Sequence, residues 1–145
     1  MTFHSVITIR NDTRYLAFLR GWMEAARCLT GQKGFSRRQL YAVSLSLIEA
    51  VDNAIFHARP PSSSGRKWAR RFRRGTLPIR VGLMVASGKL MVTVADRGLG
   101  FKDRRTPLLL EAMHGRGLLL MRRLMTRVTH RRGHGWHSVR MVLKR

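Results

Sequence analysis

The feature that most constrains the fold is the recurrence of Ile, Val or Leu at every second position within two neighbouring segments, 79–85 and 90–96. Apolar side chains occupy every second position for most of each segment, which predicts two half-buried strands. The residues between them, Ala86–Lys89, include Gly88 and predict a tight turn. Because a short turn joins strands that run in opposite directions, the pair predicts an antiparallel hairpin.

In other segments the apolar residues recur every three or four positions, which is the spacing of a helix. Three stretches carry apolar residues at helical spacing: Tyr15–Leu29, 36–58 and 117–128. Ser36 is expected to cap the second of these helices. Further strands are expected at Phe3–Ile9 and from Trp136 to Leu143. Hairpin strands beside segregated helices predict a two-layer α+β sandwich.

The length and composition favour one domain covering residues 1–145. Within it, 60–75 combines Pro, Ser and Gly with a basic run, which predicts an exposed loop insertion. No stretch of 18 apolar residues is present, and Met1–Arg10 contains no apolar leader. Cys28 is the single cysteine, so an internal disulfide is excluded. These features predict a cytoplasmic protein without a membrane span.

The charge balance is extreme, with 29 Lys and Arg residues against 7 Asp and Glu and a net charge of +22. A surface this basic favours an anionic partner such as a nucleic acid, an acidic protein or a phosphate ligand. Because carboxylates are so rare in the chain, the position of each of them is worth examining, although Asp12, Glu24 and Asp103 are expected to have no special role.

A stripe of polar residues runs along one face of the second predicted helix. Glu49, Asn53 and His57 stand four residues apart and therefore share one helical face. A carboxylate flanked by apolar residues is partly desolvated and suits a general base, and an amide oxygen one turn later suits a hard cation such as Mg²⁺. The alternative is an ordinary solvated face of an amphipathic helix.

Two glycine-containing motifs follow. The first, Asp96–Phe101, begins at the end of a predicted strand, where a carboxylate can accept a hydrogen bond from an exocyclic amine such as that of adenine. The second, Gly115–Gly117, precedes the third predicted helix, whose N-terminus can attract phosphate. Each motif alone is also compatible with a simple turn or hinge.

In this order, the three motifs resemble the Bergerat (GHKL) ATP-binding fold, and within it the anti-sigma factor serine/threonine kinases. The resemblance rests on residues 49–58, 96–101 and 115–125 and covers nearly the whole chain. It implies a sandwich of the histidine-kinase-like ATPase type, with about three helices on one face of a mixed, mainly antiparallel sheet. The basic stretch at 60–75 is not typical of the family.

The resemblance also implies roles for individual residues. Glu49 would activate the attacking hydroxyl, Asn53 would coordinate Mg²⁺ bound to the triphosphate, and Asp96 would bind the adenine amine. The remaining nucleotide-binding positions would be His57, Gly98, Gly100, Gly115, Arg116, Gly117, Leu118 and Ser138. Ser138 would help to hold adenine from the last strand, and Lys102–His114 would form a short lid over ATP.

These roles predict a Mg²⁺- and ATP-dependent serine/threonine kinase that sequesters a sigma factor and phosphorylates an anti-anti-sigma partner of the STAS type. The resemblance further implies a homodimer.

One alternative is a nucleotide-binding regulator without catalytic activity. The other is a nucleic-acid-binding protein that uses the basic stretch 66–74. A metal site at His130, His134 and His137 is disfavoured by the neighbouring arginines.

Overall fold

The structure is a computed structural model of the chain, and it describes residues 2–29, 34–57, 77–86, 88–98 and 116–145. Its elements, in chain order, are β1 (Phe3–Arg10), α1 (Tyr15–Leu29), α2 (Arg37–His57), β2 (Pro78–Ala86), β3 (Lys89–Asp96), α3 (Arg116–Leu124), β4 (Arg127–Gly133) and β5 (Trp136–Lys144). The loop expected at 60–75 lies outside the described residues. No helix in the described part of the chain is both long and apolar enough to cross a bilayer.

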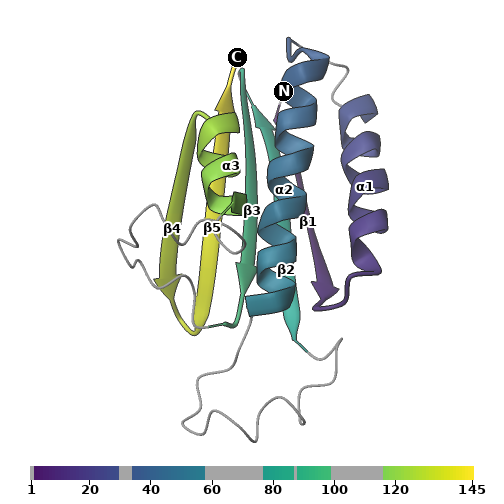
Figure 1. The fold of residues 1–145 in the computed structure, drawn as a ribbon. Coiled ribbons are helices and arrows are strands. Elements are labelled where there is room, and N and C mark those ends of the chain that lie inside the picture. The colour runs from purple at the N-terminus through teal and green to yellow at the C-terminus, as the bar shows by residue number, and fades with distance from the viewer. Residues whose placement is uncertain (1, 30–33, 58–76, 87, 99–115) are drawn as a thin grey trace, which may run out of the picture.

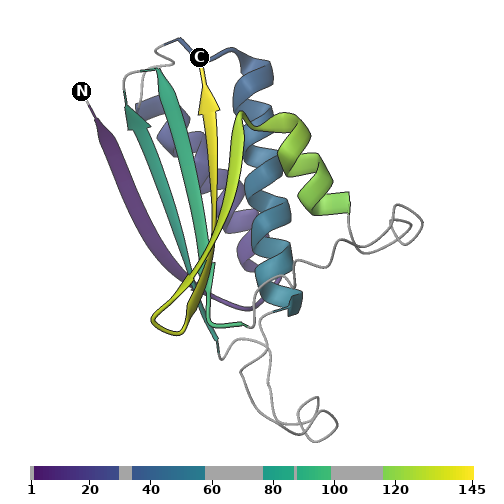
Figure 2. The same cartoon turned by 90° about the vertical axis from the view of Figure 1, so that its left-hand side faces the viewer.

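The strands of the described residues form one five-stranded sheet in the order β1-β2-β3-β5-β4. Figure 1 shows α1, α2 and α3 side by side in front of this sheet, and Figure 2 shows the two layers from the side. The expected two-layer α+β sandwich is therefore confirmed. All four strand pairings are antiparallel, whereas the resemblance implied a mixed sheet.

The core lies between the two layers and follows the two periodicities of the sequence. On α2, Val43, Leu47 and Val51 recur at intervals of four residues and are fully buried. They face the inward positions of the central strands, where every second side chain is buried. The most completely buried strand residues on this side of the sheet are Ile79, Val81, Leu83, Val92, Val94 and Met141. Burial of these side chains supplies the main driving force for folding.

Side chains at the start of each of the first two helices hold their first turns. Ser36 Oγ accepts a hydrogen bond from the Gln39 backbone N–H at 3.2 Å, and the Ser36 N–H donates to Gln39 Oε1 at 2.8 Å. This reciprocal pair is a capping box, so the predicted cap of α2 is confirmed. At the start of α1, the Asp12 carboxylate accepts a hydrogen bond from the Arg14 backbone N–H at 2.9 Å.

The last third of the chain differs from the prediction. The helix expected at 117–128 ends at Leu124, and Arg127–Gly133 forms β4, a strand that the sequence analysis missed. The β4–β5 hairpin turns at His134 and Gly135, both with positive φ (51° and 73°), as in a type I′ turn. Pairing with β5 thus overrides the helical pattern that continues through Val128.

Candidate functional site

The N-terminal turn of α3 lies against two polar residues of α2. A β-carbon built on Gly117 would stand 2.8 Å from Glu49 Oε2 and 3.2 Å from Asn53 Nδ2. Such distances are shorter than van der Waals contact, so only glycine allows this approach without displacing a neighbour. The structure therefore brings together residues 68 positions apart that the sequence analysis had assigned to one site.

The packing of two helices produces this arrangement. Glu49 and Asn53 are one turn apart on the side of α2 that faces α3, and both are half-buried. The first turn of a helix has unpaired backbone N–H groups and a partial positive charge. The start of α3 therefore combines N–H donors, a carboxylate and an amide within a few ångströms. Arg116, the first residue of α3, is exposed and adds a guanidinium at this end of the helix.

Asp96 is the last residue of β3 and lies on the side of the sheet that faces the helices. It is 8% exposed, and its Oδ1 accepts a hydrogen bond from the Gly98 N–H at 2.6 Å. This bond fixes the orientation of the carboxylate at the end of the strand. Figure 1 shows that the C-terminal ends of α2 and β3 lie at the same edge of the sandwich. Asp96, at the end of β3, therefore lies at the edge where α2 ends, and Glu49 and Asn53 are in the C-terminal half of that helix.

His137 lies directly opposite Asp96 in the β3–β5 pairing. Its Nδ1 is 3.8 Å from Asp96 Oδ2, and its side chain is 6% exposed. A distance of 3.8 Å is too long for a hydrogen bond, so this pair leaves Oδ2 able to accept one from a ligand. His137 is not among the residues predicted from the sequence for the nucleotide site.

The structure does not place Ser138 on the face of the sheet that carries Asp96. It pairs with Ala95 and lies on the opposite face of the sheet from Asp96, because consecutive residues of a strand point to opposite sides. Its predicted contact with adenine is therefore wrong, and His137 occupies the corresponding inward position. The signal was present in the sequence, since Val139, Met141 and Leu143 are the inward residues of β5 and His137 continues their alternation.

A second imidazole extends this surface. The rings of His130 on β4 and His137 on β5 are stacked, with centroids 5.9 Å apart and planes inclined by 17°. Both rings lie on the helix side of the sheet, and the His137 ring lies beside the Asp96 carboxylate. In the described part of the chain, no three His, Cys, Asp or Glu side chains are grouped closely enough to hold a metal ion.

The other predicted positions are divided between the described and undescribed parts of the chain. Leu118 is partly buried and packs against the hydrophobic core, so its side chain supports the first turn of α3. Gly100, Gly115 and the expected lid at 102–114 lie outside the described residues. His57 is the last residue of α2, and its side chain is likewise not described.

The donor set fits a hard divalent cation that arrives with a phosphate ligand. Mg²⁺ prefers oxygen ligands and is usually held by one or two protein groups together with substrate phosphates. The Asn53 side chain, whose Nδ2 is the atom nearest the start of α3, also carries an amide oxygen, and Glu49 supplies a carboxylate next to it. The chemistry of these groups suits a phosphate chain with its metal at one end of the site and an amine-bearing ring near Asp96.

Two comparisons with known proteins give matches that cover most of the chain. A family model described as a histidine kinase-like ATPase domain matches residues 11–143. The crystal structure of the RsbU and RsbW domains of Rv1364c from Mycobacterium tuberculosis superimposes with a TM-score of 0.64 at 15% sequence identity, covering 98% of this chain. At this identity the likeness shows the fold, and the chain corresponds to 32% of that longer protein. No curated protein sequence matches the chain.

Proposed function

Because the chain belongs to the histidine kinase-like ATPase domain family, we propose that it is a Mg²⁺- and ATP-dependent protein serine/threonine kinase that acts as an anti-sigma factor. Family membership implies nucleotide binding at the site. The kinase activity and its direction toward transcription regulation are the proposal. The contact of Gly117 with Glu49 and Asn53 carries it, because this contact places a candidate base beside a candidate phosphate-binding helix N-terminus.

Each residue has a defined task in this proposal. Asp96 accepts a hydrogen bond from the adenine amine, and the N–H groups at the start of α3 bind the phosphate chain. Arg116 adds a forked donor for phosphate oxygens. When bound with the triphosphate, Mg²⁺ neutralises charge on the phosphate oxygens, and Asn53 would hold it.

Glu49 is the proposed general base. It accepts the proton of the attacking serine or threonine hydroxyl while the hydroxyl oxygen forms a bond to the γ-phosphorus. The bond from the γ-phosphorus to the β–γ bridging oxygen breaks, and ADP leaves. Because phosphoryl transfer needs positioning and charge stabilisation more than covalent chemistry, these few groups are sufficient.

The proposed partners follow from the resemblance to anti-sigma kinases and from the named domain of the structural neighbour, RsbW. The phosphate acceptor is an anti-anti-sigma protein of the STAS type, and the sequestered protein is a sigma factor, both in the cytoplasm. The net charge of +22 supports acidic partner surfaces. The proposal includes a homodimer, as in the kinases that the sequence resembles.

Two measurements on the purified full chain test this function. Calorimetric titration with Mg²⁺ and ADP or a non-hydrolysable ATP analogue tests binding, and transfer of radiolabelled γ-phosphate to the co-purified partner from the native host tests the kinase step. Glu49→Gln should retain nucleotide affinity and lose transfer by about 100-fold or more, as expected for loss of a general base.

The outcomes separate the alternatives. Transfer that Glu49→Gln leaves unchanged would exclude Glu49 as the base. Nucleotide binding without any transfer by the wild-type protein would instead identify a regulator that acts by sequestration alone. Absence of saturable nucleotide binding would overturn the proposal as a whole.

A further inference from the structure

The face of the sheet that points away from the helices is strongly basic. The pairing of the strands and the alternating burial along each strand place eight cationic side chains on this face: Arg10, Arg80, Lys89, Arg97, Arg127, Arg131, Arg140 and Lys144. No described element packs against this face, which we call the open face (Figure 2). Every described carboxylate lies elsewhere, in the helices, in the turn before α1 or on the helix side of β3. Charge on the open face is therefore of one sign.

The open face is also hollowed. A groove of about 300 Å³ runs over β2 and β3, and its floor includes Gly82, where the sheet has no side chain. Met84 and Met91 give it apolar walls, and Arg80 and Arg140 stand beside it. A second hollow of about 420 Å³ is lined by Lys89, Thr126, Arg127, Val142 and Lys144. Apolar floors beside guanidinium and ammonium groups suit a ligand with flat apolar parts and repeated negative charges.

An aromatic residue organises one end of the open face. The guanidinium carbon of Arg80 lies 4.3 Å from the centroid of a Trp136 ring, and that of Arg97 lies 4.9 Å from it. Cation–π contacts of this kind hold guanidinium groups in place while leaving their N–H donors available. A guanidinium fork matches the geometry of phosphate oxygens.

From these features we infer that the open face binds single-stranded nucleic acid. The arginines contact the phosphate backbone. Bases stack on the side chains of Trp136, Arg80 and Arg97 and fill the groove beside Met84 and Met91. A single strand is favoured over a duplex, because a duplex keeps its bases stacked inside and offers none to an apolar groove on a flat sheet. This site is separate from the nucleotide site, which lies on the helix side of the sheet.

A second copy of this chain fits the open face poorly. A two-fold interface brings the same patch of both protomers together, so the eight cations of one face would meet the same eight of the other. Burying like charges without a compensating carboxylate is strongly unfavourable. A polyanion removes this repulsion and releases counterions, which gives the binding a steep dependence on salt.

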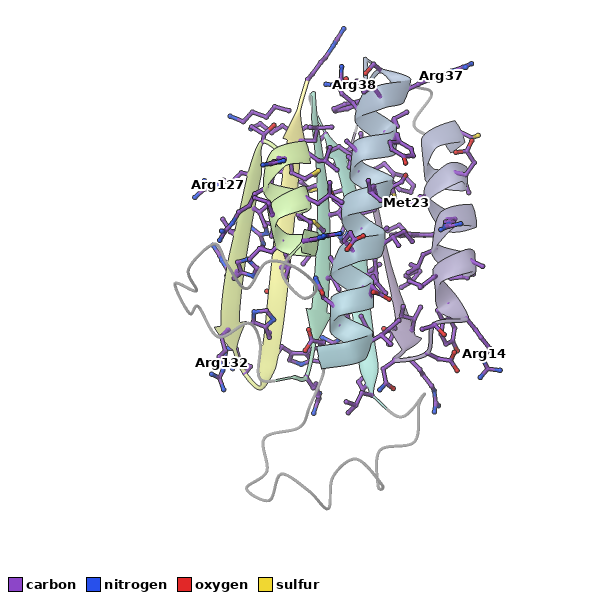
Figure 3. All side chains as sticks on the ribbon, viewed as in Figure 1. Arg14, Met23, Arg37, Arg38, Arg127 and Arg132 are labelled. Carbon is purple, nitrogen blue, oxygen red and sulfur yellow. The ribbon has the colours of Figure 1, made fainter. Side chains whose placement is uncertain are left out.

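The test compares two double variants that each remove two positive charges. Arg80→Ala with Arg140→Ala alters the open face, whereas Arg37→Ala with Arg38→Ala alters exposed residues at the start of α2, on the helix layer (Figure 3). Fluorescence anisotropy with labelled 20-mers of deoxythymidine and of uridine measures affinity across a salt series. The open-face variant should lose about tenfold in affinity and reduce the salt slope by about two, and the control should lose much less.

Tryptophan fluorescence and three further comparisons test the inference independently. Binding of the oligonucleotide should quench tryptophan fluorescence, and Trp136→Phe should remove most of the quenching. Equal losses in the two double variants would show that net charge alone is responsible, and would overturn the inference. So would equal affinity for a 20-base-pair duplex, equal affinity for polyglutamate of the same charge, or a dimer in sedimentation that occludes the open face. Circular dichroism verifies that each variant is folded.

Discussion

The backbone of Gly117 on α3 lies so close to the Glu49 carboxylate on α2 that a β-carbon at position 117 would stand 2.8 Å from Glu49 Oε2. The same β-carbon would stand 3.2 Å from Asn53 Nδ2. The contact links the candidate base, the candidate metal ligand and the candidate phosphate-binding helix end. It makes position 117 the most sensitive backbone point of the proposed nucleotide site.

Gly117→Ala should therefore separate function from stability. The added methyl group displaces the Glu49 side chain, which is flexible, so the fold should persist, while affinity for Mg²⁺-ADP should fall about tenfold because the phosphate-binding end of α3 is disturbed. Gly21→Ala on α1 is the matched control, since nothing lies within 4 Å of its added β-carbon. The control should keep nucleotide affinity and gain roughly 0.5–1 kcal/mol in free energy of unfolding. Unchanged affinity in Gly117→Ala would contradict the proposed site.

Asp96→Asn tests recognition of the adenine ring. The amide retains an oxygen that accepts the hydrogen bond from the Gly98 N–H, but an NH2 donor replaces the charged oxygen that would accept a hydrogen bond from the adenine amine. Loss of a hydrogen bond to a charged group costs about 1.5–3 kcal/mol, or roughly a 10- to 150-fold rise in the Kd for ADP. Inosine diphosphate, which carries a carbonyl in place of the amine, should lose little or nothing. Glu24→Gln on α1 is the charge-matched control and should leave both affinities as they are.

His137 and Ser138 are neighbours in sequence and on opposite faces of the sheet, so they form a natural pair of variants. His137→Ala should weaken ADP binding several-fold, because it removes the side chain beside Asp96 and the ring stacked on His130. His137→Asn keeps a polar group toward Asp96 and should recover part of the affinity. Ser138→Ala should change the Kd by less than about twofold, since its side chain points away from the site. Titration calorimetry distinguishes the two, and an effect confined to Ser138→Ala would reverse the assignment.

Ser46 offers a test of stability next to the site. It lies one turn before Glu49 on α2, is 0% exposed, and its Oγ has no hydrogen-bond partner among the described residues. A buried hydroxyl without a partner is unfavourable, so Ser46→Ala should raise the free energy of unfolding by about 1 kcal/mol in urea denaturation. Destabilisation by this change would mean that the hydroxyl has a partner outside the described residues. Ser44→Ala is the control, because Ser44 Oγ donates to the Leu40 carbonyl at 3.0 Å.

Much of the fold was predictable because its elements have strong local signals. The apolar alternation of β2 and β3 and the apolar stripe of α2 set their positions to within one or two residues. The end of α3 and the whole of β4 were not predicted. Residues 125–128 continue the apolar spacing of the helix, and only pairing with β5 shows that the chain has already entered the sheet.

The candidate site divides in the same way. Glu49, Asn53 and Asp96 were selected because their residue types stand in motifs with a chemical meaning, and the structure places them on one side of the sheet. The choice of Ser138 over His137 was wrong by one residue, which in a strand exchanges one face for the other. The alternation of apolar residues in the last strand already favoured His137. The pairing of Asp96 with His137, however, follows from the register between β3 and β5, which only the structure shows.

By itself the amino-acid sequence determined the order of the described elements other than β4, the three motifs and the excess of positive charge, because periodicity and residue type act over a few neighbouring positions. Only the tertiary structure decided that Gly117 meets Glu49, that His137 faces Asp96 and that eight cations gather on one face of the sheet. These relationships depend on which helix packs on which and on the register between strands distant in sequence. Both are set by burial of the shared core and not by any local stretch of the chain.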